Sequence, residues 1–228
     1  MVADRHEHIF RNGSKTYYFS SRFFPPQVRR DVYALYGFVR VADNLVDDQP
    51  VDPDRFHTFR KTYIQAYHSG TSSGDEVIDA FIELQRRKHF DPAWTEAFLD
   101  SMEHDLSEST CETLEDVLTY IYGSAEVIGL FMARIMDLEE ASFPYAAMLG
   151  RAMQYINFIR DIAEDNGLGR RYLPWLTLPC THCRSRKREK ILENSLHSSI
   201  GRLHATKVGK RKLRKGTPTF HDATVFPS

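Results

Sequence analysis

Apolar residues recur at steps of three and four along the chain up to about residue 175, and the alternation typical of strands is scarce. This spacing places the apolar side chains on one face of a helix. Residues that commonly begin helices separate these stretches: Asp52 and Asp91, each before a proline, Ser73 with capping-box spacing, and Thr113 with Asp116. The pattern predicts an all-α fold, with its longest helices over about 26–47, 113–136 and 144–165.

Charge divides the chain near residue 180. The whole sequence has 30 Lys and Arg residues against 31 Asp and Glu, a net charge of −1. Residues 1–180 carry 18 basic and 28 acidic side chains, a net charge of −10, whereas 181–228 carry 12 and 3, a net charge of +9. The balanced total argues against a dedicated nucleic-acid-binding protein, whose basic surplus would supply most of the affinity. We therefore predict no specific nucleic-acid partner.

Membrane and export signals are absent from the sequence as given. The longest apolar run, Val127 to Met136, is shorter than the ~18–20 residues of a spanning helix and contains Arg134. The first ten residues are charged and have no apolar core of a signal peptide. Three cysteines are too few for a disulfide framework. We predict a cytoplasmic monomer.

Two pairs of aspartates stand out because they lie within apolar helical stretches: Asp43 with Asp47, and Asp161 with Asp165. On a helix this four-residue spacing puts both carboxylates of a pair on one face, about 6 Å apart. If the two helices face each other, four carboxylates converge. Only protons or cations can neutralise such a cluster.

Amide and arginine side chains accompany the pairs: Gln154, Asn157 and Arg160 near the second, and Arg40 near the first. Carboxylates that leave positions open for water and phosphate oxygens commonly hold Mg²⁺, and arginine forks bind diphosphate. The combination suggests Mg²⁺ with diphosphate. The alternative is ion pairing along each helix, such as Arg40 with Asp43 and Arg160 with Glu164.

Several blocks occur in a fixed order: SKTYY (14–18), ALYGFVRVADNLVDD (34–48), YIYGSAEVIG (120–129), QYINFIRDIAED (154–165) and GRRYLP (169–174). Together they resemble the squalene/phytoene synthase family over about residues 10–175. The resemblance implies an isoprenoid-synthase helical bundle around a central channel, with the aspartate motifs on opposite walls.

The activity implied by the resemblance is head-to-head joining of two prenyl diphosphates with Mg²⁺, or Mn²⁺ as an alternative ion. A cyclopropylcarbinyl diphosphate would form, ionise again and rearrange. We expect phytoene from geranylgeranyl diphosphate, with squalene or dehydrosqualene from farnesyl diphosphate as alternatives. No Gly-rich dinucleotide fingerprint supports NADPH use. Release of the apolar product implies peripheral contact with a membrane.

The resemblance also assigns roles to individual residues. The implied metal ligands are Asp43, Asp47, Asn157, Asp161 and Asp165. The implied diphosphate contacts are Ser14, Tyr36, Arg40, Gln154, Asn157, Arg160 and Arg171. Tyr120 would face the reacting carbons, and its alternative role is that of a half-buried core tyrosine.

From about Trp175 the sequence leaves the family pattern. We expect an incomplete catalytic domain at 1–175, without the C-terminal helices of the family, and a basic, disordered tail at 176–228. Four residues of the tail resemble a zinc site only superficially, because its histidines are too far apart: Cys180, Cys183, His197 and His204. An alternative function is that of an inactive, family-like scaffold that binds anionic surfaces through the tail.

Overall fold

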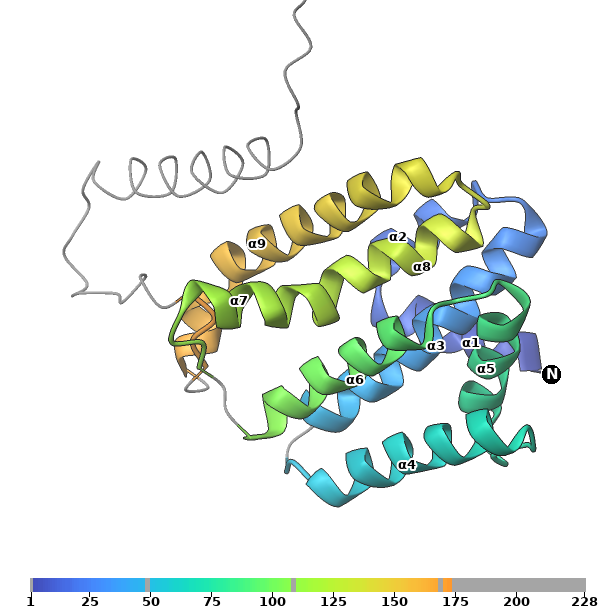
Figure 1. Cartoon of the computed structure of the whole chain (residues 1–228), viewed down its shortest axis with the longest axis horizontal. Coiled ribbons are helices and arrows are strands. Elements are labelled where there is room, and N and C mark those ends of the chain that lie inside the picture. Colours follow the sequence, from blue (N-terminus) through green and yellow to red (C-terminus); the bar gives the residue numbers. More distant parts are fainter. Residues whose placement is uncertain (1, 48–49, 108–109, 168–169, 174–228) are drawn as a thin grey trace, which may run out of the picture. The chain divides into compact units, whose positions relative to one another are not determined.

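The computed structural model describes residues 2–47, 50–107, 110–167 and 170–173. The predicted tail at 176–228, with its four candidate zinc ligands, lies outside the described residues. The described residues form helices and no strand, which confirms the all-α prediction. The elements are α1 (Val2–Gly13), α2 (Lys15–Ser21), α3 (Pro26–Asp47), α4 (Pro53–Ser69), α5 (Glu76–Arg87), α6 (Pro92–Ser107), α7 (Leu114–Ile121), the π-helix η1 (Tyr122–Glu126), α8 (Val127–Ile135), the 3₁₀ turn η2 (Glu140–Ser142) and α9 (Phe143–Gly167) (Figure 1).

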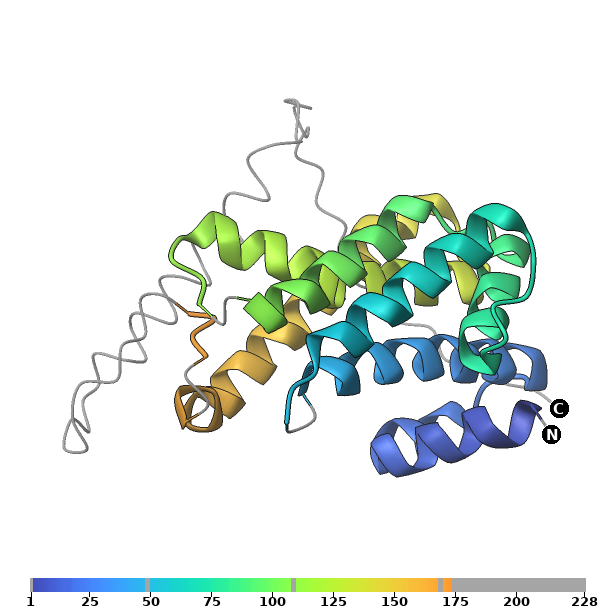
Figure 2. The ribbon, with the colours of Figure 1, turned by 90° about the horizontal axis from the view of Figure 1, so that it is seen from below.

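Helix α3 forms the centre of the larger hydrophobic core. It packs against α1, α4, α5, α6 and α8, with α1 on one side and α4 and α6 on the other (Figure 2). Leu35, Phe38 and Ala42 recur at one-turn spacing on its buried face. The ring of Phe38 is 0% exposed and stacks on Phe81, with centroids 3.9 Å apart. The aspartates at the end of α3 are therefore carried by a well-anchored helix.

The predicted helix over 113–136 contains a π-turn. Helices α7 and α8 are joined end to end by η1, which adds a residue to the helical turn next to α6 and α9. Two glycines allow the backbone of the continuous helix α7–η1–α8 to touch that of α9. A Cβ on Gly129 would overlap the carbonyl of Ala146, and one on Gly150 would overlap the carbonyl of Ala125. This close approach fixes α9 against α8 and η1.

All four predicted helix starts lie among the described residues: Pro53 and Pro92 begin α4 and α6 directly after Asp52 and Asp91. The capping box at α7 is confirmed: the Thr113 hydroxyl accepts from the Asp116 amide at 3.1 Å, and the Asp116 carboxylate accepts from the Thr113 amide at 2.8 Å. At α5 the cap is Asp75 rather than Ser73, because the Asp75 carboxylate accepts from the Val77 amide at 2.7 Å. The Ser73 hydroxyl instead accepts from the amide of Asp75 and supports the cap residue.

None of the described helices is both long enough and apolar enough to cross a membrane.

Candidate functional site

The first aspartate pair lies at the C-terminal end of α3. Arg40 donates to Asp43 at 2.7 Å from one turn back, so the ion pair considered as the alternative is present. Burial raises the pKa of Asp43, and the neighbouring Asp47 raises it further, against the opposite effects of Arg40 and Arg170. Two negative charges on Asp43 and Asp47 are therefore unfavourable together, and a bound cation would stabilise them.

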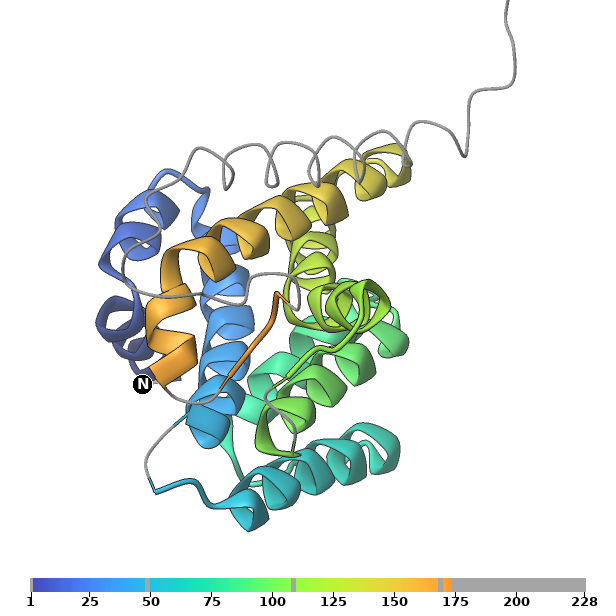
Figure 3. The same ribbon diagram turned by 90° about the vertical axis from the view of Figure 1, so that its left-hand side faces the viewer.

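Asp47 accepts a hydrogen bond from the Arg170 guanidinium at 2.8 Å. Arg170 belongs to the short segment 170–173, which follows α9 and passes between α3 and α7 (Figure 3). The Arg170 amide donates to the carbonyl of Asp165 at 2.8 Å. Arg170 therefore joins the ends of the two helices that carry the aspartate motifs. Its role was missed from the sequence, where Arg171 was chosen.

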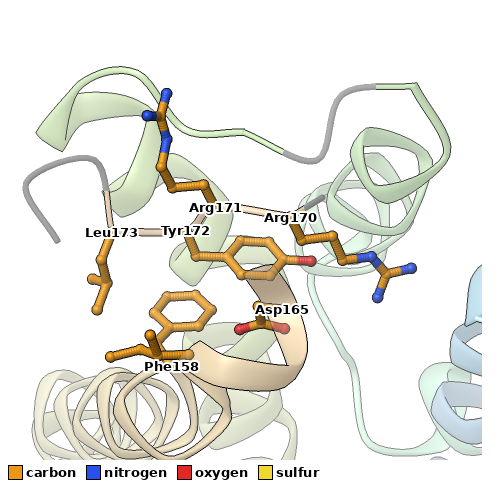
Figure 4. Close-up of a pocket in the computed structure, with 7 residues that line it drawn as sticks. Phe158, Asp165, Arg170, Arg171, Tyr172 and Leu173 are labelled. Atoms are coloured by element: carbon orange, nitrogen blue, oxygen red, sulfur yellow. The ribbon is translucent and has the colours of Figure 1, made fainter. Parts of the chain in front are cut away.

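Arg171 points away from the aspartates. It donates to Glu112 at 2.7 Å, and its carbonyl accepts from the Cys111 amide at 2.8 Å. Figure 4 shows the side chains of Arg170 and Arg171 leaving the segment on different sides. Successive side chains of an extended segment alternate in direction, so only one of the two arginines can face Asp47. The predicted contact of Arg171 with diphosphate stays a prediction.

A carboxylate that the sequence analysis did not select, Asp105 of α6, lies behind this ion pair. The hydroxyls of Tyr120 and Tyr172 donate to its two oxygens at 2.8 and 3.0 Å. Burial raises the pKa of Asp105 to about 7, although the two tyrosine hydrogen bonds act in the opposite direction. Asp47 raises this pKa further and Arg170 lowers it, which places all three charges in one neighbourhood. Little in the sequence singles out Asp105, because α6 carries three other acidic residues, Glu96, Asp100 and Glu103.

Aromatic rings form a wall beside Asp105. Phe158 and Tyr172 stack with centroids 4.8 Å apart and an interplanar angle of 7°. Tyr120 lies 4.9 Å from Tyr172, is 8% exposed, and has its pKa raised by burial and by Asp105. Tyr120 is therefore a core tyrosine, and it also presents its hydroxyl to the acidic cluster.

The second aspartate pair, on α9, has an arginine partner of its own. Arg160 donates to both oxygens of Asp161, at 2.7 and 2.6 Å, and these hydrogen bonds lower the pKa of Asp161. Asp165 lines a small pocket with Phe158, Arg170 and Tyr172 (Figure 4). The side chain of Glu164, the partner considered for Arg160, lies outside the described residues.

The remaining predicted diphosphate contacts lie along α2, α3 and α9. Ser14 caps α2 by accepting from the Tyr17 amide at 3.3 Å. Burial raises the pKa of Tyr36, with Arg40 and Asp43 as charged neighbours. Asn157 donates to Gln154 at 3.3 Å, so these amides share one face of α9. The binding roles of these residues stay predictions.

The donor chemistry of both motifs fits Mg²⁺, because carboxylate and amide oxygens are its preferred protein ligands. The raised pKa of Asp43 is also what an added cation would relieve. Within the described part of the chain, however, no three His, Cys, Asp or Glu side chains lie close enough together to hold one ion. The predicted convergence of four carboxylates is therefore not assembled in this structure.

Comparison with known proteins gives the class first. The crystal structure of a dehydrosqualene synthase in complex with ligand superposes with a TM-score of 0.71 at 24% identity, covering 90% of this chain and 75% of that chain. This likeness shows that the fold is that of the all-α isoprenoid synthases, as predicted.

The sequence gives the family. A model of the squalene/phytoene synthase family matches residues 10–199. The 15-cis-phytoene synthase of Pantoea ananas is 29% identical over 227 residues, which cover 93% of this chain and 70% of that protein. The phytoene synthase of Pseudescherichia vulneris is 33% identical over 188 residues, with 77% and 61% covered. The chain belongs to the squalene/phytoene synthase family.

The extent of these matches bears on the predicted domain boundary. The family match runs past residue 175, where we placed the end of the resemblance, and reaches residue 199. The chain spans 61% of the Pseudescherichia protein and 58% of a 15-cis-phytoene synthase from a Paracoccus strain.

Proposed function

We propose that the chain carries the Mg²⁺-dependent head-to-head condensation of two prenyl diphosphates and makes phytoene from geranylgeranyl diphosphate. The observation that supports this most is the pairing of Asp43 and Asp47 with two arginines, directly beside the aromatic wall of Tyr120, Phe158 and Tyr172. Charge stabilisation and an apolar surface are the two needs of a reaction that releases diphosphate and leaves an allylic cation.

The polar half of the site would bind the leaving group. Asp43, Asp47, Asp161, Asp165 and Asn157 are the residues that would hold Mg²⁺, which when bound makes diphosphate a better leaving group. Arg40 and Arg160 lie one turn or one residue from these aspartates and already donate to carboxylates. Their guanidinium groups suit diphosphate oxygens for the same geometric reason.

The apolar half would protect the cation. The faces of Phe158 and Tyr172 carry the negative side of the aromatic quadrupole, which attracts a cation without supplying a nucleophile. Asp105 accepts hydrogen bonds from both tyrosine hydroxyls, so it holds the two rings in place. Tyr120 is protonated near neutral pH, and burial raises its pKa still further above the ordinary value.

The test is incubation of the full chain with radiolabelled C15 or C20 diphosphate and Mg²⁺, followed by extraction of the hydrocarbon. We expect a C40 product from the C20 substrate. Asp47→Asn should lower turnover by at least ~100-fold. The matched control is Asp54→Asn, an exposed acid in the first turn of α4, which should stay within about twofold of the unmodified chain.

The outcomes separate the alternatives. A C30 product from farnesyl diphosphate alone would move the assignment to squalene or dehydrosqualene synthesis. A folded chain that releases no diphosphate from either substrate would overturn the activity and favour the scaffold.

A further inference from the structure

Arg170 pairs with Asp47, and the proposed reaction gives this arginine no step of its own. Its guanidinium donates to Asp47 of the first motif, and its amide is bound to the carbonyl of Asp165 in the second, each at 2.8 Å. The side chain is 15% exposed. Arg40, by contrast, pairs with Asp43 from within the same helix and is 39% exposed. Arg170 is thus a largely enclosed cation supplied to α3 from a distant part of the chain.

The segment that carries Arg170 is fastened at several points. The Arg171 carbonyl accepts from the Cys111 amide, and Tyr172 donates to Asp105. The exposed pair of Arg171 with Glu112 adds little, because solvent screens it. Arg170 therefore cannot leave Asp47 by a large movement without strain on the contacts of residues 171–173.

We propose that Arg170 is a positioning residue that neutralises Asp47 in place of a divalent ion, so that ion binding at Asp47 releases the segment 170–173. The inference rests on the proposed function, since it uses Asp47 as an ion ligand. The released guanidinium, still tethered at the end of α9, is then available to the diphosphate that accompanies the ion. One carboxylate thereby couples ion binding to the position of the segment.

Competition for Asp47 has a measurable consequence. A cation that must displace Arg170 binds more weakly than it would to a free carboxylate, by the free energy of the contacts that are broken. Removing the guanidinium should therefore strengthen ion binding. The neighbouring Arg171 faces Glu112, so removing its charge should have little effect.

The first experiment measures Mn²⁺ binding to the full chain without substrate, by the electron paramagnetic resonance signal of the free ion. Arg170→Gln should bind Mn²⁺ at least about fivefold more tightly than the unmodified chain. Arg171→Gln should stay within about twofold. Arg170→Lys keeps the charge and should lie between them, which provides a readout if the Gln variant does not fold.

The second experiment separates displacement from simple electrostatic repulsion. Hydrogen exchange of the Cys111 amide, which is bonded to the Arg171 carbonyl, is followed with and without Mg²⁺. Release of the segment should accelerate this exchange in the unmodified chain. In Arg170→Gln the segment no longer depends on Asp47, and Mg²⁺ should leave the exchange rate unchanged.

Equal Mn²⁺ affinities of the unmodified chain and Arg170→Gln would overturn the inference and leave the proposed function standing. Exchange at Cys111 that ignores Mg²⁺ in the unmodified chain would do the same. Failure of every variant to bind either ion would overturn the ion site of the proposed function, and the inference with it.

Discussion

Helices α3 and α9 each carry one aspartate motif, but they are held in different ways. Helix α3 packs against helices on several sides, and its apolar residues Leu35, Phe38 and Val46 are at most 3% exposed. Helix α9 packs against α8, η1 and η2. Leu149 and Ile156, on the face of α9 opposite its aspartates, are 65% and 57% exposed. The first motif is therefore positioned by the core, whereas the second depends on one line of contacts.

The electrostatics follow the same division. Burial raises the pKa of Asp43 on α3, whereas the hydrogen bonds from Arg160 lower that of Asp161 on α9. The largest effect on the pKa of Asp43 is burial, whereas the largest effect on the pKa of Asp161 is its hydrogen bonds with Arg160. The surrounding structure therefore holds the aspartates of α3 more firmly than those of α9.

The difference in packing predicts the largest effect. Phe38→Ala removes a fully buried ring that stacks on Phe81, and it should lower the free energy of unfolding by about 3–5 kcal/mol. Ile156→Ala, on the exposed face of α9, should cost less than about 0.5 kcal/mol. Urea denaturation followed by far-ultraviolet circular dichroism measures both. Similar losses for the two variants would mean that the exposed face of α9 is covered in solution.

The close contact between α9 and η1 at Gly150 predicts the next largest loss of stability. In Gly150→Ala the new methyl group meets the carbonyl of Ala125, and backbone cannot give way as a side chain can. The free energy of unfolding should fall by about 1–3 kcal/mol. Gly167→Ala is the control, because nothing lies within 4 Å of its Cβ position. Equal melting temperatures for the two variants would contradict the close approach of α9 and η1.

Asp105, which accepts hydrogen bonds from Tyr120 and Tyr172, gives a pH-dependent effect. Its folded-state pKa of about 7 lies above the ordinary 3.8, so the folded state binds the proton more tightly than the unfolded state. The stability that this supplies is complete below about pH 4 and is lost as the pH rises to about 7. Asp105→Asn should therefore be about 1–2 kcal/mol more stable than the unmodified chain at pH 8, after loss of one tyrosine hydrogen bond.

The measurement is urea denaturation of metal-free protein between pH 4 and 8. The advantage of Asp105→Asn should shrink as the pH falls. An advantage that stays constant with pH would show that Asp105 does not take up a proton in this range.

Much of the fold follows from local rules that the sequence displays. The helices α3 and α9 were predicted within two residues of their observed ends, because apolar periodicity and proline punctuation mark them directly. The π-turn at Tyr122–Glu126 was not predicted. It lies where α7–η1–α8 packs against α6 and α9, and the spacing of apolar residues over one turn does not predict such contacts.

The site was predictable only where its residues form a pattern along one helix. The aspartates form two pairs with a spacing of four residues, Asp43 with Asp47 and Asp161 with Asp165. The resemblance to the family then assigned both pairs to metal binding. Asp105 has no such repeat, and its importance comes from hydroxyls that arrive from α7 and from the segment 170–173. The choice between two adjacent arginines depended on the direction of an extended segment, which is set by its contacts with Cys111 and Asp47.

The smallest effect tests the comparison of the two motifs most directly. In metal-free protein, the raised pKa of Asp43 means that its contribution to stability is lost as the pH rises through that pKa. The lowered pKa of Asp161 means the reverse: its contribution is present above the ordinary value and is lost as the pH falls. Asp43→Asn should thus gain on the unmodified chain with rising pH, and Asp161→Asn should lose.

Each difference should stay below about 1 kcal/mol, because both side chains are about a third exposed and solvent screens their pairs. Urea denaturation of the three proteins between pH 3 and 7, with a chelator present, resolves the two slopes. Slopes of the same sign would show that Asp43 and Asp161 carry their charge in the same way, and the difference in packing between α3 and α9 would then not extend to electrostatics.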